Sequence, residues 1–144
     1  MTWYYNGLPV NKEELEDYFG FVYIITRLDT NKKYIGKKLL KFKRTKKVKG
    51  KKKKFLIESD WETYWGSNKV LLQELQELGE QIFKREILKL CRSRGECNYH
   101  EAKLQFENNV LESDMWYNEW IMCKIHKSHV KVKEKKTDLI KLRQ

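Results

Sequence analysis

The chain has only three cysteines, Cys91, Cys97 and Cys123, and their odd number and irregular spacing argue against a disulfide framework of the secreted kind. A long apolar run is also missing, because stretches such as FVYII (21–25) are too short to span a bilayer. The first ten residues, MTWYYNGLPV, lack the charged and apolar regions of a signal peptide. We therefore expect a soluble protein of the reducing cytoplasm, with no membrane partner.

Acidic residues are absent from 37–54, KKLLKFKRTKKVKGKKKK, where twelve of eighteen residues are Lys or Arg. The formal net charge of the chain is +11, and the stretch 124–144 is also strongly basic. Such concentrated positive charge attracts polyanions and gives salt-dependent binding through the release of counterions from phosphates. The charge therefore favours nucleic acid as the partner, and the alternative is a solvated lysine-rich loop that serves solubility.

A length of 144 residues is typical of a single domain with a real core. The turn residues LDTNKK separate two segments rich in β-branched and aromatic residues, which predicts a hairpin. SNKVLLQELQELG places leucines at helical spacing between a Ser/Asn start and a Gly stop, which predicts an amphipathic helix. For QIFKREILKLC a strand is favoured over a short helix. In chain order the patterns predict a short helix at 11–20, strands at 21–27 and 33–36, a helix at 67–79, a strand at 81–91, a helix at 97–110 and a short helix or turn at 114–125, an α/β arrangement in which helices cover a small sheet.

The chain lacks a Gly-rich phosphate loop and a nucleophilic Ser with a plausible His partner. What remains is a pair of tyrosines, Tyr23 and Tyr34, in the triplets FVY and YIG on either side of the hairpin turn, with Lys37 directly after. Hydrolysis of a phosphodiester needs a proton acceptor near the attacking water, a cation for the charge that develops, and usually a divalent metal on oxygen ligands. Lysines and a metal ion close by would lower the phenol pKa from its usual value near 10. The alternative to a catalytic role is that both tyrosines are aromatic residues that merely favour a strand.

The two triplets and their spacing resemble the signature of the GIY-YIG endonuclease family, although Phe21 replaces the first glycine. The segment WETYWGSNKVLLQELQELG (61–79) is also similar to the YYGSS region of small freestanding phage nucleases of the homing type. The resemblance implies a three-stranded antiparallel sheet flanked by helices. It divides the single domain into an N-terminal helix at 1–19, a nuclease core at 20–122 with a lysine-rich insertion at about 45–60, and a basic tail at 123–144.

Site residues follow from the same resemblance. It implies a catalytic lysine at Lys37 and a catalytic arginine at Arg44, on a helix after the second triplet. It implies a metal-binding glutamate at Glu101, which would open the helix after the third strand, and a late asparagine at Asn118 in the pair YN. Glu101 has a structural alternative, because with Asn98 it forms an N-x-x-E capping box.

The function implied is a Mg²⁺- or Mn²⁺-dependent endonuclease that cuts DNA, as in the cytoplasm of a phage-infected bacterium, with no small-molecule cofactor. A homodimer and a monomer of loose specificity are both open. The rival is a nucleic-acid-binding protein that keeps the fold without cutting. The aromatic residues Trp61, Tyr64 and Trp65 either stack on bases or sugar faces, or pack in the core. The residues expected to contact DNA are Lys38, Lys41, Lys43, Lys46, Lys47 and Trp65.

Overall fold

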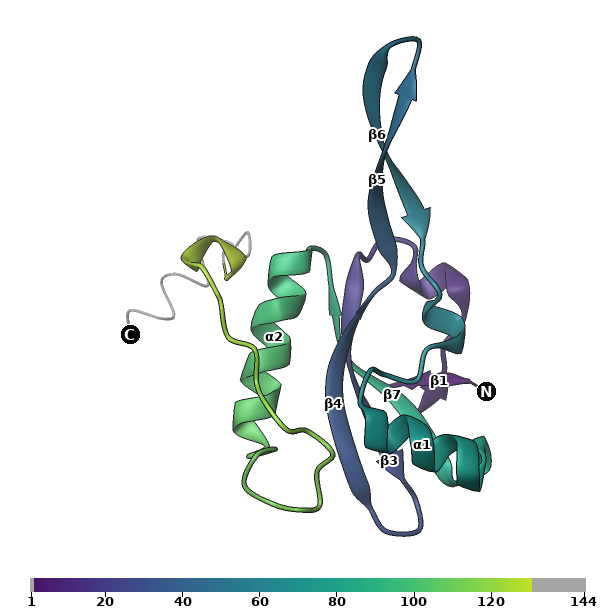
Figure 1. Cartoon of the computed structure of the whole chain (residues 1–144), viewed down its shortest axis with the longest axis vertical. Helices are drawn as coiled ribbons and strands as arrows, with labels where there is room; N and C mark the ends of the chain where they lie inside the picture. Colours follow the sequence, from purple (N-terminus) through teal and green to yellow (C-terminus); the bar gives the residue numbers. More distant parts are fainter. Residues whose placement is uncertain (1, 131–144) are drawn as a thin grey trace.

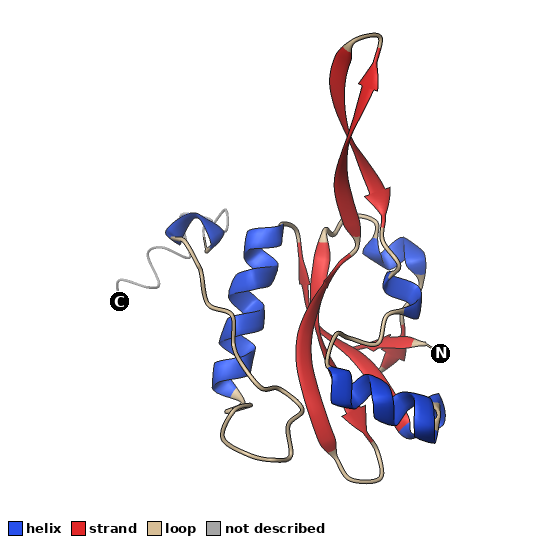
Figure 2. Cartoon of the chain, viewed as in Figure 1, coloured by secondary structure: helices blue, strands red, loops and turns tan. Residues whose placement is uncertain are grey.

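A computed structural model of the chain describes residues 2–130, so the predicted basic tail lies outside the described residues beyond Val130. A mixed five-stranded sheet forms the centre, in the order β2-β1-β7-β3-β4, and a separate two-stranded hairpin projects from it (Figures 1 and 2). Within residues 2–130 no helix is long and apolar enough to cross a membrane. The elements are β1 (Trp3–Tyr5), β2 (Leu8–Pro9), η1 (Lys12–Leu15), β3 (Gly20–Arg27), β4 (Lys32–Leu39), β5 (Lys41–Val48), β6 (Lys51–Glu58), η2 (Trp61–Thr63), α1 (Lys69–Leu78), η3 (Glu80–Ile82), β7 (Phe83–Cys91), α2 (Arg94–Glu107) and η4 (Lys127–His129).

The predicted hairpin and third strand are confirmed as β3, β4 and β7, with β3 antiparallel to both neighbours. The prediction of a three-stranded sheet is wrong, because the N-terminal segment adds β1 parallel to β7 and β2 antiparallel to β1. Trp3 explains this addition. Its buried ring packs edge-on against Phe21, with centroids 4.9 Å apart, and its indole N–H donates to the Trp61 carbonyl at 2.8 Å. A strand of three residues leaves no readable period in the sequence.

The two faces of the sheet follow the alternation of side chains along β3. Phe21, Tyr23 and Ile25 point to the face that packs with Leu71 of α1. The neighbouring Val22 points to the other face, where Cys97 of α2 covers it. The helices therefore lie on opposite sides of the sheet, and β4 is one of its two edge strands.

The lysine-rich insertion is neither a loop nor a helix but an antiparallel hairpin, β5 with β6, which we call the arm (Figure 1). Lys49 and Gly50 form its turn with φ of 52° and 76°, the backbone geometry that tight hairpins prefer. Arg44 lies in β5 opposite Phe55, so the expectation that it sits on a helix is wrong. The reason is the β-forming content of the segment, including FLI in β6, which outweighs the helix propensity of lysine.

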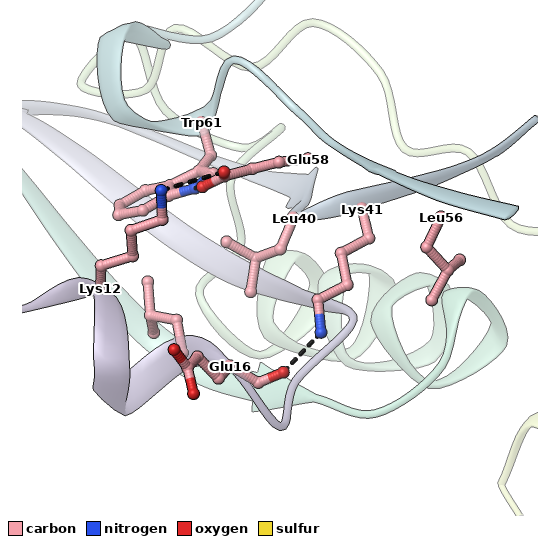
Figure 3. A pocket seen from close by; sticks show the side chains of 8 residues that line it. Lys12, Glu16, Leu40, Lys41, Leu56, Glu58 and Trp61 are labelled. Atoms are coloured by element: carbon pink, nitrogen blue, oxygen red, sulfur yellow. Dashed lines mark hydrogen bonds and ion pairs between the residues drawn. The ribbon is translucent and has the colours of Figure 1, made fainter.

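The base of the arm is fixed to the body by polar contacts around a small apolar pocket of about 350 Å³ (Figure 3). Lys12 of η1 forms an ion pair with Glu58 at 3.0 Å, and Lys41 Nζ donates to the Glu16 carbonyl. Leu40 and Trp61 are among the residues that line the pocket. These contacts hold the first residues of the arm against the body and leave its far half exposed.

Helix α1 begins after Asn68 and ends before Gly79, as predicted. At η1, Asn11 accepts from the Glu14 N–H as predicted, although the helix is only one 3₁₀ turn. Helix α2 starts four residues before Asn98, with Ser93 as its N-cap. Glu101 therefore lies inside the helix and does not open it, and the capping-box alternative is wrong. The segment 114–125 forms no helix and runs as a turn and an extended segment.

Candidate active site at the edge of the sheet

A pocket of about 700 Å³ lies at the outer edge of β4, and we call it the edge pocket. Five stretches far apart in the sequence build its wall: β3, β4, the loop before α1, α2 and the segment after β-bridge residue Trp116. We call residues 113–122, which contain this last stretch, the strap. The residues that line the edge pocket are Tyr23, Tyr34, Lys37, Tyr64, Ser67, Asn68, Lys69, Glu101, Gln105, Asn118, Glu119, Trp120 and Met122.

The two predicted tyrosines lie side by side in this pocket. Tyr23 is 1% exposed, and its ring centroid lies 6.2 Å from that of Tyr34 and 6.0 Å from that of Tyr64. Tyr23 and Tyr34 share one face because Tyr23 pairs with Gly36, two residues after Tyr34 in β4. The phenols therefore meet where the face of the sheet reaches its edge.

Two glycines leave room for these rings. A Cβ atom on Gly36 would lie 2.5 Å from Tyr23 Oη and 2.9 Å from Tyr34 Cε1, closer than any real contact allows. Gly66 has a φ of +90°, and a Cβ there would lie 3.2 Å from Tyr23 Oη. The glycine of the YIG triplet is thus a condition for the buried position of Tyr23.

Glu101 comes from the helix on the opposite face, but it reaches the pocket around the edge of the sheet. Its carboxylate accepts a hydrogen bond from the Lys37 backbone N–H on β4. The Lys37 side chain lies on the same side and donates to Asn98 Oδ1, one turn earlier in α2. The carboxylate is close enough to the phenols that its negative charge contributes to raising the pKa of both Tyr23 and Tyr34.

Burial governs the protonation of the three acids. It raises the pKa of Glu101 above the usual carboxyl value, against the opposing effect of the Lys37 ammonium. It raises the pKa of Tyr23 well above 10, helped by Tyr64 and Tyr34, and it raises the pKa of Tyr34 against a hydrogen bond with Ser67. Without a metal ion, both phenols thus have a raised pKa, and the lowering expected from lysines together with a metal ion stays a prediction.

Asn118 is held by the backbone of β4. Its Oδ1 accepts from the Ile35 N–H at 3.1 Å and its Nδ2 donates to the Ile35 carbonyl at 2.8 Å, so the amide acts as a short extra strand. Gln105 of α2 donates to the same carbonyl at 2.9 Å. Asn118 thus fixes the residue between Tyr34 and Gly36, which is a positioning role.

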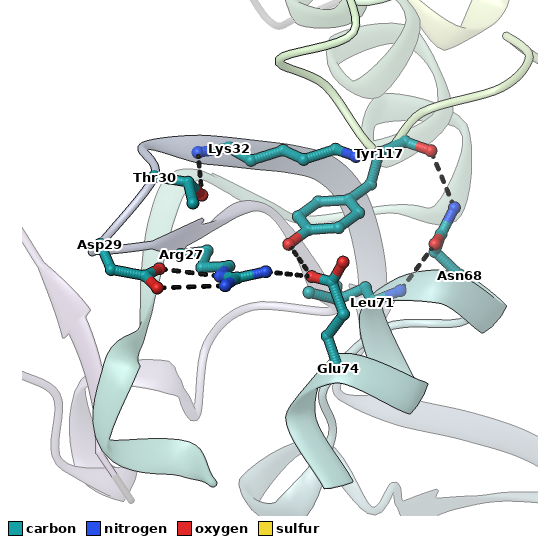
Figure 4. Close-up of polar contacts among 8 residues, drawn as sticks. All are labelled: Arg27, Asp29, Thr30, Lys32, Asn68, Leu71, Glu74 and Tyr117. Carbon is teal, nitrogen blue, oxygen red and sulfur yellow. Dashed lines mark hydrogen bonds and ion pairs between the residues drawn. The ribbon is translucent and has the colours of Figure 1, made fainter. Parts of the chain in front are cut away.

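A polar network joins the strap to α1 and β3 (Figure 4). Tyr117 donates its hydroxyl to Glu74, which also accepts from Arg27 at 3.2 Å. Asn68 caps α1 by accepting from the Leu71 N–H at 3.0 Å, and its amide nitrogen donates to the Tyr117 carbonyl at 2.9 Å. The strap and the start of α1 are therefore held together at the mouth of the edge pocket.

The other predicted site residues lie elsewhere. Arg44 and the predicted DNA contacts at positions 41, 43, 46 and 47 are on the arm and do not line the edge pocket. Lys38 is largely covered, with an ion pair to Asp60 at 2.6 Å and its ammonium 4.1 Å from the Tyr64 ring centre. Trp65 is 7% exposed and packs between Phe83 and the Arg85 guanidinium, so the prediction that it stacks on bases is wrong. A tryptophan that faces the core and one that faces DNA look the same in the sequence.

Several pocket residues were not predicted. Ser67 and Lys69 flank Asn68, the N-cap of α1. The sequence predicts that a helix starts here but not that its start faces the pocket. Gln105 lies one turn after Glu101 on α2, and this i to i+4 spacing was a signal that could have found it. Trp120 and its neighbours carried no signal beyond their aromatic and apolar character.

The pocket gathers several polar groups of different kinds. It combines phenol hydroxyls, the half-buried carboxylate of Glu101 and the ammonium of Lys37. Residues 2–130 hold no group of three or more His, Cys, Asp or Glu that would suit a metal bound by protein alone. Cys123, His126 and His129 belong to no such group, and the two histidines cap η4.

Comparisons with known proteins agree with this geometry. No curated protein and no solved structure matches the chain. The family described as “Putative endonuclease segE, GIY-YIG domain” matches residues 3–121, which include β1, the whole sheet, both helices and the strap as far as Ile121. The chain belongs to this GIY-YIG nuclease family.

Proposed function

We propose that the chain is a metal-dependent DNA endonuclease that hydrolyses phosphodiester bonds in the edge pocket. One observation carries the proposal: the fold brings Tyr23, Tyr34, Lys37 and Glu101 from three separate elements to one concave site. Each of these groups has a use in phosphodiester hydrolysis and little use as a buried structural polar group.

Glu101 is the residue that would hold the metal. The pKa of this half-buried carboxyl is raised although the Lys37 ammonium opposes the effect of burial, and a bound cation would further stabilise its charged form. A single carboxylate suits Mg²⁺ or Mn²⁺, since Mg²⁺ usually keeps several waters and takes further oxygens from the substrate phosphate. When bound, such an ion would stabilise the negative charge that develops on the phosphate oxygens and would lower the pKa of a coordinated water.

The chain's own residues would then orient and activate the substrate. Lys37, held beside Glu101 by Asn98, donates to a phosphate oxygen on which negative charge develops, and loss of such a donor typically costs about 10²–10³ in rate. Tyr34, bonded to Ser67, orients the attacking water. Tyr23, as phenolate, would accept the proton of that water and become the neutral phenol. Because burial raises its pKa, the phenolate would form only when a bound cation adds positive charge beside it. The products would carry 5′-phosphate and 3′-hydroxyl ends.

The arm would bind the DNA backbone. Its far half pairs Lys46 with Lys53 and Lys47 with Lys52 across the strands, and like charges in direct opposition destabilise a hairpin. A two-stranded ribbon is at best marginally stable by itself. The opposed lysines therefore favour binding of a polyanion, which would neutralise the positive charge on both faces of the ribbon. Arg44 belongs to this surface rather than to the catalytic set. Phosphate contacts position a protein without specifying a sequence. The predicted contacts retained here are Lys41, Lys43, Lys46 and Lys47.

We place the biological role with phage nucleases of the homing type, on the similarity of residues 61–79 to that group. A homodimer would let two edge pockets cut two strands, whereas a monomer would nick.

Supercoiled plasmid tests the proposal. With Mg²⁺ the wild-type chain converts it to nicked or linear DNA, and EDTA, Tyr23→Phe or Glu101→Ala abolishes the conversion. A matched control is Glu107→Ala, which removes an exposed carboxylate further along the same helix. If the protein shifts the plasmid in a gel but leaves it intact with Mg²⁺, the nuclease proposal is rejected in favour of a nucleic-acid-binding protein that does not cut.

A further inference from the structure

Trp120 and Met122 form an apolar rim on the edge pocket. Trp120 is 74% exposed and Met122 is 70% exposed, although both line the same pocket as Tyr23 and Glu101. The other four tryptophans, all within residues 2–130, are buried or half-buried. Trp120 is therefore much more exposed than the other four tryptophans. Because it lies on the edge pocket, it is also not an isolated apolar residue of the surface.

The backbone that carries Trp120 is fixed on both sides. Before it, Tyr117 and Asn118 are buried and hydrogen-bonded to α1 and β4. After it, Ile121 packs with the apolar cluster between α2 and the sheet. The indole thus projects from an anchored strap, and a side chain on an anchored backbone loses less entropy when it binds a partner.

The chemistry of the rim is complementary to a nucleobase rather than to a phosphate. An exposed indole offers a face on which a base stacks, and methionine is among the side chains that wedge between bases. Glu119 also lines the pocket, and its carboxylate repels phosphate but accepts hydrogen bonds from an exocyclic amino group such as that of cytosine. The cationic groups lie further along the wall, at Lys37 and Lys69.

We infer that the rim of Trp120, Glu119 and Met122 binds one nucleobase of the DNA strand whose phosphate lies in the edge pocket. The inference rests on the proposed function, because that function places the phosphate next to the rim and the sugar tethers the base to its phosphate. A base inside a duplex exposes only its edge, so the base bound here has left the stack.

Binding in EDTA tests this inference without any cleavage. The probes are a short labelled oligodeoxycytidine and an abasic oligomer of the same length and charge. Wild-type protein binds the first about tenfold more tightly than the second, as expected for one base stacked on an aromatic side chain. Trp120→Ala brings this ratio close to one and leaves the affinity for the abasic oligomer unchanged, whereas Trp120→Phe keeps most of the ratio.

Phe106→Ala is the control, because Phe106 is an aromatic residue that is 58% exposed on α2 and does not line the pocket. It leaves the ratio at the wild-type value. A ratio that is unchanged in Trp120→Ala overturns the inference, even where the same preparation cuts plasmid. A ratio that collapses in Trp120→Ala supports it, and plasmid that stays intact in that case counts against the nuclease proposal alone.

Discussion

Gly36 decides where the Tyr23 ring can lie. Because a Cβ there would meet Tyr23 Oη at 2.5 Å, Gly36→Ala must displace the phenol or β4. We expect the free energy of unfolding to fall by about 1–3 kcal/mol, as for other overpacked sites. We expect plasmid cleavage to slow by at least about tenfold, since misplacement of a catalytic group by an ångström has larger effects than that.

Gly50→Ala is the matched control for this prediction. Gly50 lies at the tip of the arm with φ +76°, and a Cβ there meets nothing within 4 Å. Backbone strain costs about 1–2 kcal/mol at such a position but leaves the pocket intact. Urea unfolding and initial cleavage rates separate the two variants, and a Gly36→Ala enzyme as fast as wild type would contradict the role of this glycine.

Glu101 should reduce stability in the absence of metal. Burial raises its pKa, so folding takes up a proton, and the free energy of unfolding falls as pH rises through the unfolded carboxyl pKa, about 4.3, toward the raised folded value. Glu101→Gln removes the charge and keeps an acceptor for the Lys37 N–H. In EDTA at pH 7 it should raise Tm by a few degrees, and this gain should vanish below about pH 4.

Adding Mg²⁺ should change the relative stability of the wild type and Glu101→Gln. A ligand that binds only the folded state raises its stability, so Mg²⁺ should raise Tm of the wild type and leave Glu101→Gln unchanged. Thermal scans with and without Mg²⁺ measure both effects. Equal responses to Mg²⁺ in the two proteins would show that the ion binds elsewhere.

At the scale of elements, the side-chain amide of Asn118 joins the strap to the backbone of β4. Asn118→Ala leaves the buried Ile35 N–H without its partner, while the Ile35 carbonyl keeps Gln105. An unsatisfied buried donor costs about 1–3 kcal/mol, which urea unfolding would show together with slower cleavage. Asn108→Ala removes an exposed amide that donates to Leu104 and should cost less than about 0.5 kcal/mol. Equal costs in the two variants would remove the special role of Asn118.

The arm should control affinity and its dependence on salt. Replacing Lys46, Lys47, Lys52 and Lys53 by Gln removes two opposed pairs of like charge, so the arm keeps its register and loses phosphate contacts. The slope of log affinity against log salt should fall by about 3 to 4, at about 0.9 per contact. The control removes the same charge at Lys84, Lys89, Lys103 and Lys124, and slopes that fall equally in both variants would argue against the arm.

The sequence predicts the elements that have strong local signals. It does not predict elements whose formation depends on contacts between residues far apart in the chain. Helix α1 has both caps and a leucine period, and the hairpin has its turn, so both were correct. β1 is too short for a pattern, and Trp3 reaches its partners only in the folded chain. The sequence predicts only a lysine-rich insertion for the arm. Its two strands are exposed on both faces, so lysines occupy both and no alternation of polar and apolar residues marks a strand.

At the scale of the whole molecule, the pocket exists because β4 is an edge strand. Phenols from one face and a carboxylate from the helix on the other face meet where the sheet stops. The sequence order of the family motifs predicts the participants, and the closing contacts between Glu101, Asn118 and the β4 backbone are visible only in the fold. The arm extends away from the five-stranded sheet (Figure 1).

The most direct test of the edge pocket as a metal-assisted site is the anomalous scattering of Mn²⁺ in crystals of the protein. We expect a peak within about 2–2.5 Å of a Glu101 carboxylate oxygen, inside the pocket that holds Tyr23 and Tyr34, and we expect no such peak in crystals of Glu101→Gln. A peak on other carboxylates with none at Glu101, in crystals whose edge pocket is open to solvent, would contradict the account.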